Sequence, residues 1–304
     1  MATQSREEAN MQTNADGRPR RCSGPGLTGR PGPLAHSDRL RSSGEHETFL
    51  RSLARRRMLV GTARAMLLVA FVVLWEVAAR FGWINAFVVS QPSRALATAM
   101  SMARRGELWI HLGMTVGETA IGFTVGTLIG IVAAVMLWWS DLLSDILDPY
   151  IVVLNSIPKV ALGPIFIVWL GTTVTAIIAM AISISVIVTI MMVYVGFREV
   201  DPDRVKLLRT FGATRLQILS KVVLPASVPV MIAALKVNVG LSMVGTIVGE
   251  FLVSKAGLGF LIVYGGQVFN MSLVMSSVIL LSIVSVLLYY GVSALEQAVL
   301  RTRE

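Results

Sequence analysis

Apolar residues in this chain occur in long, almost uninterrupted runs. A helix needs about 20 mostly apolar residues to cross the hydrocarbon core of a bilayer, and six stretches have this character. They are Ala63–Ala79, Met114–Trp139, Ile146–Leu170, Val174–Val195, Val228–Phe251 and Leu273–Val299. Helices are expected because backbone polar groups in lipid must be hydrogen-bonded within their own segment. The pattern therefore predicts an all-α, polytopic membrane protein with six transmembrane helices, in a domain that covers residues 58–304.

The first 57 residues differ in composition from the rest. They contain eleven arginines, six acidic residues, four prolines and six glycines, and large apolar residues are sparse and aperiodic. Such a segment buries too little apolar surface to offset the loss of chain entropy. Residues 1–57 are therefore expected to form a disordered basic tail. A nucleic-acid-binding arm is disfavoured because aromatic residues do not alternate with the arginines, so no nucleic acid is expected as a partner.

The distribution of Lys and Arg predicts the orientation in the membrane. With the N-terminal segment in the cytoplasm, twenty of the 27 Lys and Arg residues fall in cytoplasmic segments and four in outer segments. Because cytoplasmic loops carry an excess of these residues, both termini are expected in the cytoplasm, with the protein in the inner membrane of the cell. The net charge of +9 has the same origin, and a content of 54% apolar and 15% charged residues argues against a soluble enzyme.

Small residues recur every fourth position in the second span, at Gly122, Gly126, Gly130 and Ala134. This spacing places them on one helix face, where another helix can approach closely. The stripe therefore predicts a packed helix bundle and carries no chemistry of its own.

Polar and helix-breaking residues inside the spans are candidates for a translocation path. Pro158 interrupts the third span and Lys159 follows directly. Because an unpaired charge in lipid is costly, Lys159 is expected to face the bundle interior, either lining the path or pairing with a carboxylate such as Glu250 or Glu118. Asn238 in the fifth span and Glu250 at its outer end complete the candidates, and Glu250 is also a candidate for an external gate or for docking a partner.

The loop between the fourth and fifth spans predicts two short helices. Asp201 is a favourable N-cap, and Gly212 suits the position after a helix end, so the first helix is expected over Pro202–Phe211. Thr214 and Gln217 fit a capping box that starts a second helix, expected to end before Pro225. The pair offers a docking surface for a soluble partner or lies on the lipid headgroups.

This loop resembles the conserved cytoplasmic loop of binding-protein-dependent ABC importer permeases. The signature of that loop is Glu-Ala-Ala, a glycine after three further residues, and I-x-L-P after nine more. Gly212 matches the glycine, and Val222-Val223-Leu224-Pro225 matches I-x-L-P with valine for isoleucine. Lys206-Leu207-Leu208 stands where the signature has Glu-Ala-Ala. A family-like core covers about residues 110–299.

Other segments are similar to the subfamily that imports sulfonates, taurine, nitrate and thiamine-precursor pyrimidines. They are Ser156–Leu162, Ile167–Gly171, Val248–Phe251 and Gly257–Gly259. The resemblance implies a type I importer permease fold and a small, anionic or polar organic solute. It also implies three kinds of partner: a second permease copy in a homodimer or heterodimer, ABC ATPase subunits, and an extracytoplasmic solute-binding protein.

In the resembled family the cytoplasmic helices at about residues 201–224 couple the permease to the ATPase. The resemblance implies that the coupling loop of this chain contains Asp201, Pro202, Val205, Lys206, Leu207, Leu208, Phe211, Gly212, Ala213, Leu224 and Pro225. ATP and Mg²⁺ are expected on the ATPase partner, and no cofactor is expected in this chain.

Motifs for autonomous chemistry are missing from the sequence. There is no G-x-x-x-x-G-K-[ST] phosphate loop, no His or Cys pair at metal-ligand spacing, and only one cysteine, Cys22. The chain is therefore not expected to be an enzyme or to bind a metal. A self-sufficient secondary transporter or channel is the alternative, although no convincing internal repeat supports it.

Overall fold

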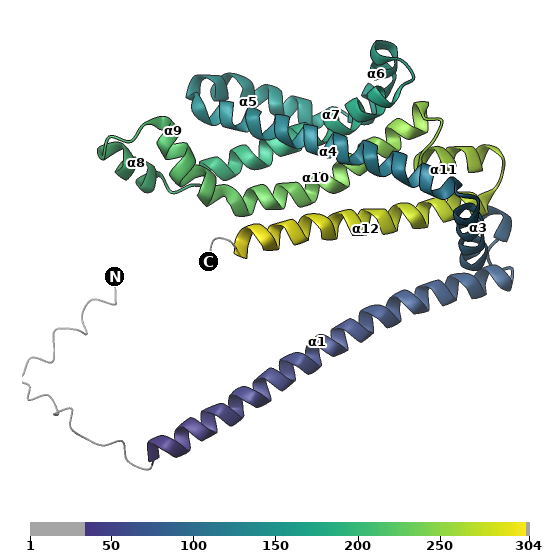
Figure 1. The fold of residues 1–304 in the computed structure, drawn as a ribbon, viewed down its shortest axis with the longest axis horizontal. Coiled ribbons are helices and arrows are strands. Elements are labelled where there is room, and N and C mark those ends of the chain that lie inside the picture. Colours follow the sequence, from purple (N-terminus) through teal and green to yellow (C-terminus); the bar gives the residue numbers. More distant parts are fainter. Residues whose placement is uncertain (1–33, 302–304) are drawn as a thin grey trace, which may run out of the picture. The chain divides into compact units, whose positions relative to one another are not determined.

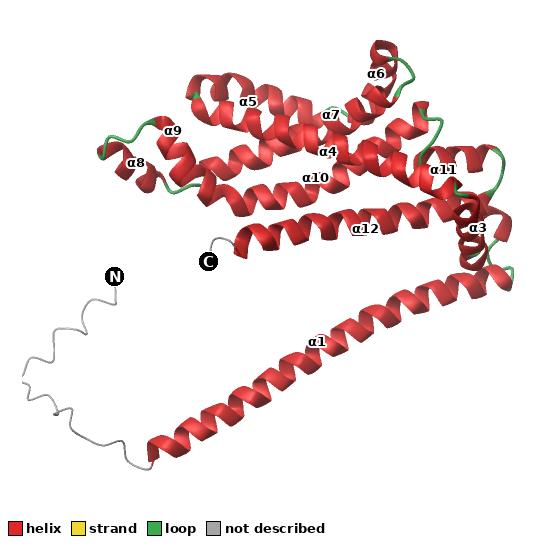
Figure 2. Ribbon diagram, viewed as in Figure 1, coloured by secondary structure: helices red, strands yellow, loops and turns green. Residues whose placement is uncertain are grey.

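The computed structural model describes residues 34–301, and all regular elements in that range are helices (Figures 1 and 2). In chain order they are α1 (Leu34–Arg80), α2 (Ala86–Val89), α3 (Pro92–Arg105), α4 (Glu107–Trp139), α5 (Asp141–Ser156), the 3₁₀ turn η1 (Lys159–Leu162), α6 (Gly163–Leu170), α7 (Val174–Arg198), α8 (Pro202–Thr210), α9 (Arg215–Ile218), the π-helical turn η2 (Leu219–Val223), α10 (Leu224–Val253), α11 (Leu258–Gln267) and α12 (Met271–Arg301). The chain divides into two compact units, residues 1–69 and 70–304, and the boundary falls within α1.

Five helical segments are long and apolar enough to cross a membrane. They are Met58–Arg80, Glu107–Trp139, Val174–Arg198, Arg215–Val253 and Met271–Ala294. The predicted third span corresponds to α5 and η1–α6, which meet at a bend of 89° and make a sixth span if they are counted together. The all-α membrane fold predicted from the sequence is therefore confirmed, with one of its spans broken.

The break in the third span follows from Pro158. Contact with the proline ring disfavours the helical region for the residue before a proline, and Ile157 has extended backbone angles, with φ −67° and ψ 132°. Pro149, inside α5, does not end that helix. The position of the break was therefore predicted correctly.

The first unit contains the beginning of α1. Residues 34–57 are helical, so the expectation of an unstructured tail is wrong over this range, and residues 1–33 lie outside the described residues. The segment approaching residue 57 is rich in Leu, Arg, Ala and Glu, which are good helix formers, and it continues directly into an apolar span. Helix formation therefore extends beyond the apolar run that predicted it.

In the second unit, α7 packs along both α4 and α10 (Figure 1). The predicted small-residue stripe of α4 faces α7: Gly122 lies against Ala181, Gly126 against Ser185 and Gly130 against Thr189. Ala134 continues this face in a buried cluster that includes Val193 and Phe197 of α7. The two helices approach this closely because no side chain larger than a methyl group stands between them on the α4 side.

A second glycine pair brings α10 onto α7. A Cβ atom at Gly245 would lie 2.6 Å from the Cα of Ala181, and one at Gly249 would lie 2.9 Å from the Cα of Ile177. The G-x-x-x-G spacing of these residues was visible in the sequence, but the sequence analysis did not use it. Ala181, which is fully buried, is therefore held between Gly122 of α4 and Gly245 of α10.

Replacing Gly245 by alanine is expected to push α10 away from α7. Because the added methyl group would meet backbone atoms of Ala181, the cost should be that of an overpacked core, about 1–3 kcal/mol. Thermal unfolding of the purified chain in detergent measures the change. Gly240→Ala is the matched control, since a Cβ there meets no atom within 4 Å, and equal melting temperatures for the two variants would contradict the close packing.

Candidate functional site

The two short helices α8 and α9 carry exposed apolar side chains at one end of the second unit (Figure 1). Leu207 is 58% exposed, Phe211 78% and Leu216 63%. By contrast, Val205 and Leu208 pack against the buried cluster formed by α4, α7, α9, η2 and α10. The apolar residues of this loop therefore divide into an inner set that anchors α8 and an outer set that has no covering within the described chain.

Local sequence signals build this loop. The side chain of Asp201 accepts a hydrogen bond from the backbone N–H of Asp203 at 2.9 Å, and thereby caps α8. Gly212 follows the helix with φ +77°, a conformation that favours glycine. Thr214 and Gln217 form a complete capping box at the start of α9. These three features agree with the sequence expectation.

The second helix of the loop does not end before Pro225, and this expectation is wrong. The helix continues from Arg215 to Val253 without a break. Proline lacks a backbone N–H, and its ring crowds the carbonyl group four residues earlier. The π-helical turn η2, at Leu219–Val223, precedes it and widens the helix there to a five-residue hydrogen-bonding step. One continuous helix therefore joins α9 to α10.

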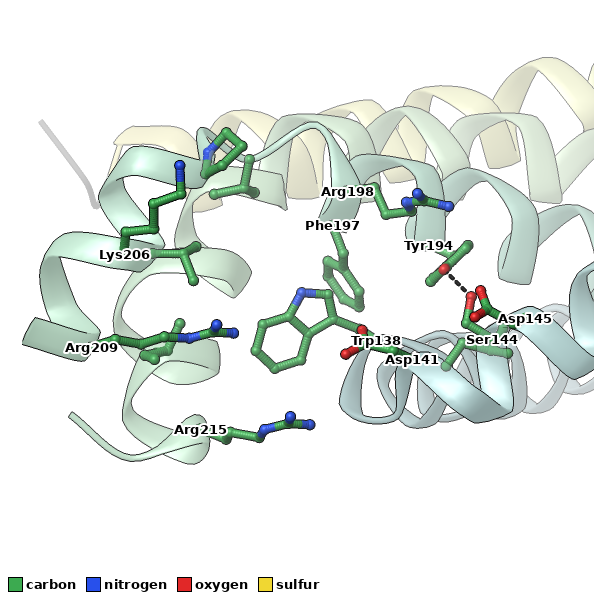
Figure 3. Close-up of a pocket in the computed structure, with 15 residues that line it drawn as sticks. Trp138, Asp141, Ser144, Asp145, Tyr194, Phe197, Arg198, Lys206, Arg209 and Arg215 are labelled. Carbon is green, nitrogen blue, oxygen red and sulfur yellow. Dashed lines mark hydrogen bonds between the residues drawn. The ribbon is translucent and has the colours of Figure 1, made fainter. Parts of the chain in front are cut away.

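A pocket of about 340 Å³ lies beside the loop, between the ends of α4 and α7, the start of α5, and α8–α9 (Figure 3). Four cationic side chains, Arg198, Lys206, Arg209 and Arg215, line it together with Asp141 and Asp145 of α5. Its remaining lining residues are Leu137, Trp138, Ser144, Tyr194, Phe197, Val200, Pro202, Val205 and Ile218. The sequence analysis missed this pocket because its walls come from five elements that only the tertiary fold brings together.

Lys159 lies in the bend of the third span. Its Nζ atom donates a hydrogen bond to the backbone oxygen of Asn155 at 3.0 Å and contacts the side-chain oxygen of that residue at 3.4 Å. The expected pairing of Lys159 with Glu250 or Glu118 is therefore not observed in the structure. The last carbonyl groups of α5 need donors because the helix stops at Ser156, and Lys159 supplies one of them.

Asn238 joins three helices. It is fully buried, and its side-chain nitrogen donates to the hydroxyl groups of Thr189 on α7 and Thr127 on α4. This places Asn238 inside the α4–α7–α10 packing rather than on an open passage. Nearby on α10, Lys236 forms an ion pair with Glu296 of α12 at 2.5 Å, a partner that the sequence analysis did not identify.

Glu250 organises the loop after α10. Its carboxylate accepts hydrogen bonds from the hydroxyl group of Thr115 at 2.6 Å and from the backbone N–H of Gly259 at 2.5 Å. The side chain is only 1% exposed, so it does not offer a surface for a gate or for a docked protein in this structure. Glu118 is also buried, beside Glu250.

Two further hydrogen bonds fix the same loop to α4. The backbone N–H of Leu258 donates to the Thr115 hydroxyl group at 2.8 Å, and that of Gly257 donates to Nδ1 of His111 at 3.0 Å. Gly257 has φ +125°, and a Cβ at Gly259 would lie 2.6 Å from Oε2 of Glu250. The glycines seen in the sequence therefore allow the backbone to close around a buried carboxylate at the start of α11. Among the described residues, no group of three or more His, Cys, Asp or Glu side chains could hold a metal ion.

Comparison with known proteins identifies relatives of this chain. Residues 126–302 match the family described as binding-protein-dependent transport system inner membrane component. A probable ABC transporter permease protein of Haemophilus influenzae is 27% identical, over 72% of this chain and 89% of the relative. A putative aliphatic sulfonates transport permease protein of Bacillus subtilis is 28% identical, over 80% of this chain and 88% of the relative.

Solved structures have the same fold. The inward-facing MetNI methionine ABC transporter gives a TM-score of 0.57 at 22% identity, covering 66% of this chain and 98% of the other. A bacterial ABC transporter involved in the import of alginate gives a TM-score of 0.59 at 14% identity, covering 86% and 99%. At these identities the likeness shows that the fold is shared, and both matched chains are covered almost completely.

Removal of the Glu250 carboxylate is expected to loosen the loop around Gly257. In Glu250→Ala, Gly259 and Thr115 lose their acceptor, so Lys255, which is exposed in this loop, should become a faster site of tryptic cleavage. Mass spectrometry of the fragments from the intact purified chain would measure the cleavage rate. Glu199→Ala is a suitable control because Glu199 is an exposed carboxylate that follows α7, far along the chain from this loop. Unchanged cleavage after Lys255 would show that Glu250 does not hold the loop.

Proposed function

This chain belongs to the family of binding-protein-dependent transport system inner membrane components, and we propose how it works as the permease subunit of an ATP-driven importer. Separate ATPase subunits bind ATP and Mg²⁺ and dock on α8 and α9. A second permease copy, of the same or a related chain, completes the translocation path. A solute-binding protein delivers the solute from outside, and both termini lie in the cytoplasm.

The observation that supports ATPase docking is the outer apolar set of the loop. Leu207, Phe211 and Leu216 are exposed at the tip of a segment that otherwise carries many charges, and such side chains are typical of a helix that inserts into a groove of a protein. The other interpretation, two helices lying on lipid headgroups, gives no role to the continuous helix that joins α9 to α10. Docking gives this helix a role, because an ATPase that displaces α9 also moves α10.

The named relatives support a small organic solute with an anionic or polar group. One is named for aliphatic sulfonates and another, from Escherichia coli, for taurine. Both names describe small molecules with a sulfonate group. Small organic sulfonates are therefore the first solutes to test for transport. The alternative of a self-sufficient transporter lacks support, since the chain's relatives are named as permease components of transport systems.

Replacement of Phe211 by serine is expected to weaken the ATPase complex about tenfold or more, the loss typical of a central apolar anchor. The side chain is 78% exposed, so the isolated permease should keep its stability. Co-purification of the ATPase with the tagged permease measures the loss. Leu96→Ser removes an exposed apolar side chain from α3 and should leave the complex intact. Normal ATPase recovery with Phe211→Ser would exclude α8 as the docking element.

The orientation has a direct test, because Cys22 is the only cysteine. In a Cys22→Ser background, Lys255→Cys should react with a membrane-impermeant maleimide in intact cells whose outer membrane has been permeabilised. Arg209→Cys should react only after the inner membrane is opened. The reverse labelling pattern would place the termini outside.

A further inference from the structure

The pocket between α5 and α8–α9 lies at the ends of two membrane spans. The span that contains α4 ends at Trp139, and the span formed by α7 ends at Arg198. Trp138 and Tyr194, next to these ends, line the pocket, and Trp and Tyr are enriched where a span meets the water. The pocket is therefore at the depth of the lipid headgroups.

Its charges are not balanced. Four cationic residues and two aspartates give the lining a net charge of about +2, because Arg198, Lys206, Arg209 and Arg215 outnumber Asp141 and Asp145. Basic pockets between span ends are a recognised means of holding anionic headgroups. Both aspartates come from α5, so all charged lining residues on the side formed by α8 and α9 are cationic.

The donors of this side are largely available. The guanidinium group of Arg209 has no hydrogen bond or ion pair with another residue in the described part of the chain, and Figure 3 shows the side chain extending towards Trp138. Arg215 uses one nitrogen, Nη1, to donate to the backbone oxygen of Trp139 at 2.5 Å. Lys206 contacts Asp203 at 3.1 Å. Guanidinium groups can donate two parallel hydrogen bonds to phosphate oxygens, and the two arginines retain donors for this.

We propose that this pocket binds the phosphate headgroup of an anionic membrane lipid. The source is the membrane rather than a soluble phosphate because the pocket lies at the ends of two spans. Those spans also carry apolar side chains close to their ends, since Met136 of α4 and Val195 of α7 are about half exposed. The inference depends on the pocket and on the spanning helices, and it requires neither the ATPase nor the proposed orientation.

Retention of lipid by the purified full-length chain tests the site. The chain, without any ATPase, is reconstituted with equal amounts of phosphatidylglycerol and phosphatidylcholine, returned to detergent and analysed by native mass spectrometry. The wild type should retain phosphatidylglycerol in preference to phosphatidylcholine. Arg209→Gln together with Arg215→Gln should reduce this preference, by about fivefold for each arginine.

Control variants separate the pocket from general charge. Arg94→Gln with Arg104→Gln removes two exposed arginines of α3 and should retain phosphatidylglycerol like the wild type. If the double variant is not monodisperse, lipid retention is measured for Arg209→Gln alone. This substitution removes no side-chain hydrogen bond or ion pair in the described chain. Equal retention by pocket and control variants would overturn the proposal. So would displacement of the lipid by millimolar inorganic phosphate, which would assign the pocket to soluble anions.

Discussion

The close contact of α7 with α4 and α10 is the constraint on which the rest of the second unit depends. Lipid gives little hydrophobic drive for one helix to join another, so dispersion contacts between closely approaching backbones must do it. Gly122 and Gly245 provide such contacts on opposite sides of Ala181. The three helices then bring together the buried polar groups and the inner apolar residues that hold α8 and α9 in place.

Three polar side chains connect helices of this bundle. Asn238 links α4, α7 and α10, Lys236 links α10 to α12, and Glu250 closes the loop before α11. In a hydrocarbon environment an unpaired polar group is expensive, so a partner on a neighbouring helix fixes the relative position of both helices. Asn238 and Glu250 were path candidates in the sequence because a linear pattern does not reveal their partners.

Features that depend on interactions between residues close in the sequence were predicted correctly, whereas most features that depend on distant residues were not. Asp201, Gly212 and Thr214 act within a few residues of themselves, and their caps and turn were predictable. The apolar spans and the break at Pro158 were predictable for the same reason. In contrast, the charged pocket and the setting of Glu250 depend on contacts between distant segments. The continuation through Pro225 was missed because a π-helical turn has no clear sequence signature.

The unbroken helix from Arg215 to Val253 acts as a lever. Its 39 residues span about 58 Å at 1.5 Å per residue. Tilting this helix by about one degree around its α9 end displaces its far end by about 1 Å, and a tilt of about five degrees displaces it by about 5 Å, the width of a side chain. That far end includes Glu250, whose hydrogen bonds tie it to α4 and α11. One helix thus runs from the exposed loop at one end of the second unit to the buried Glu250 carboxylate near its other end.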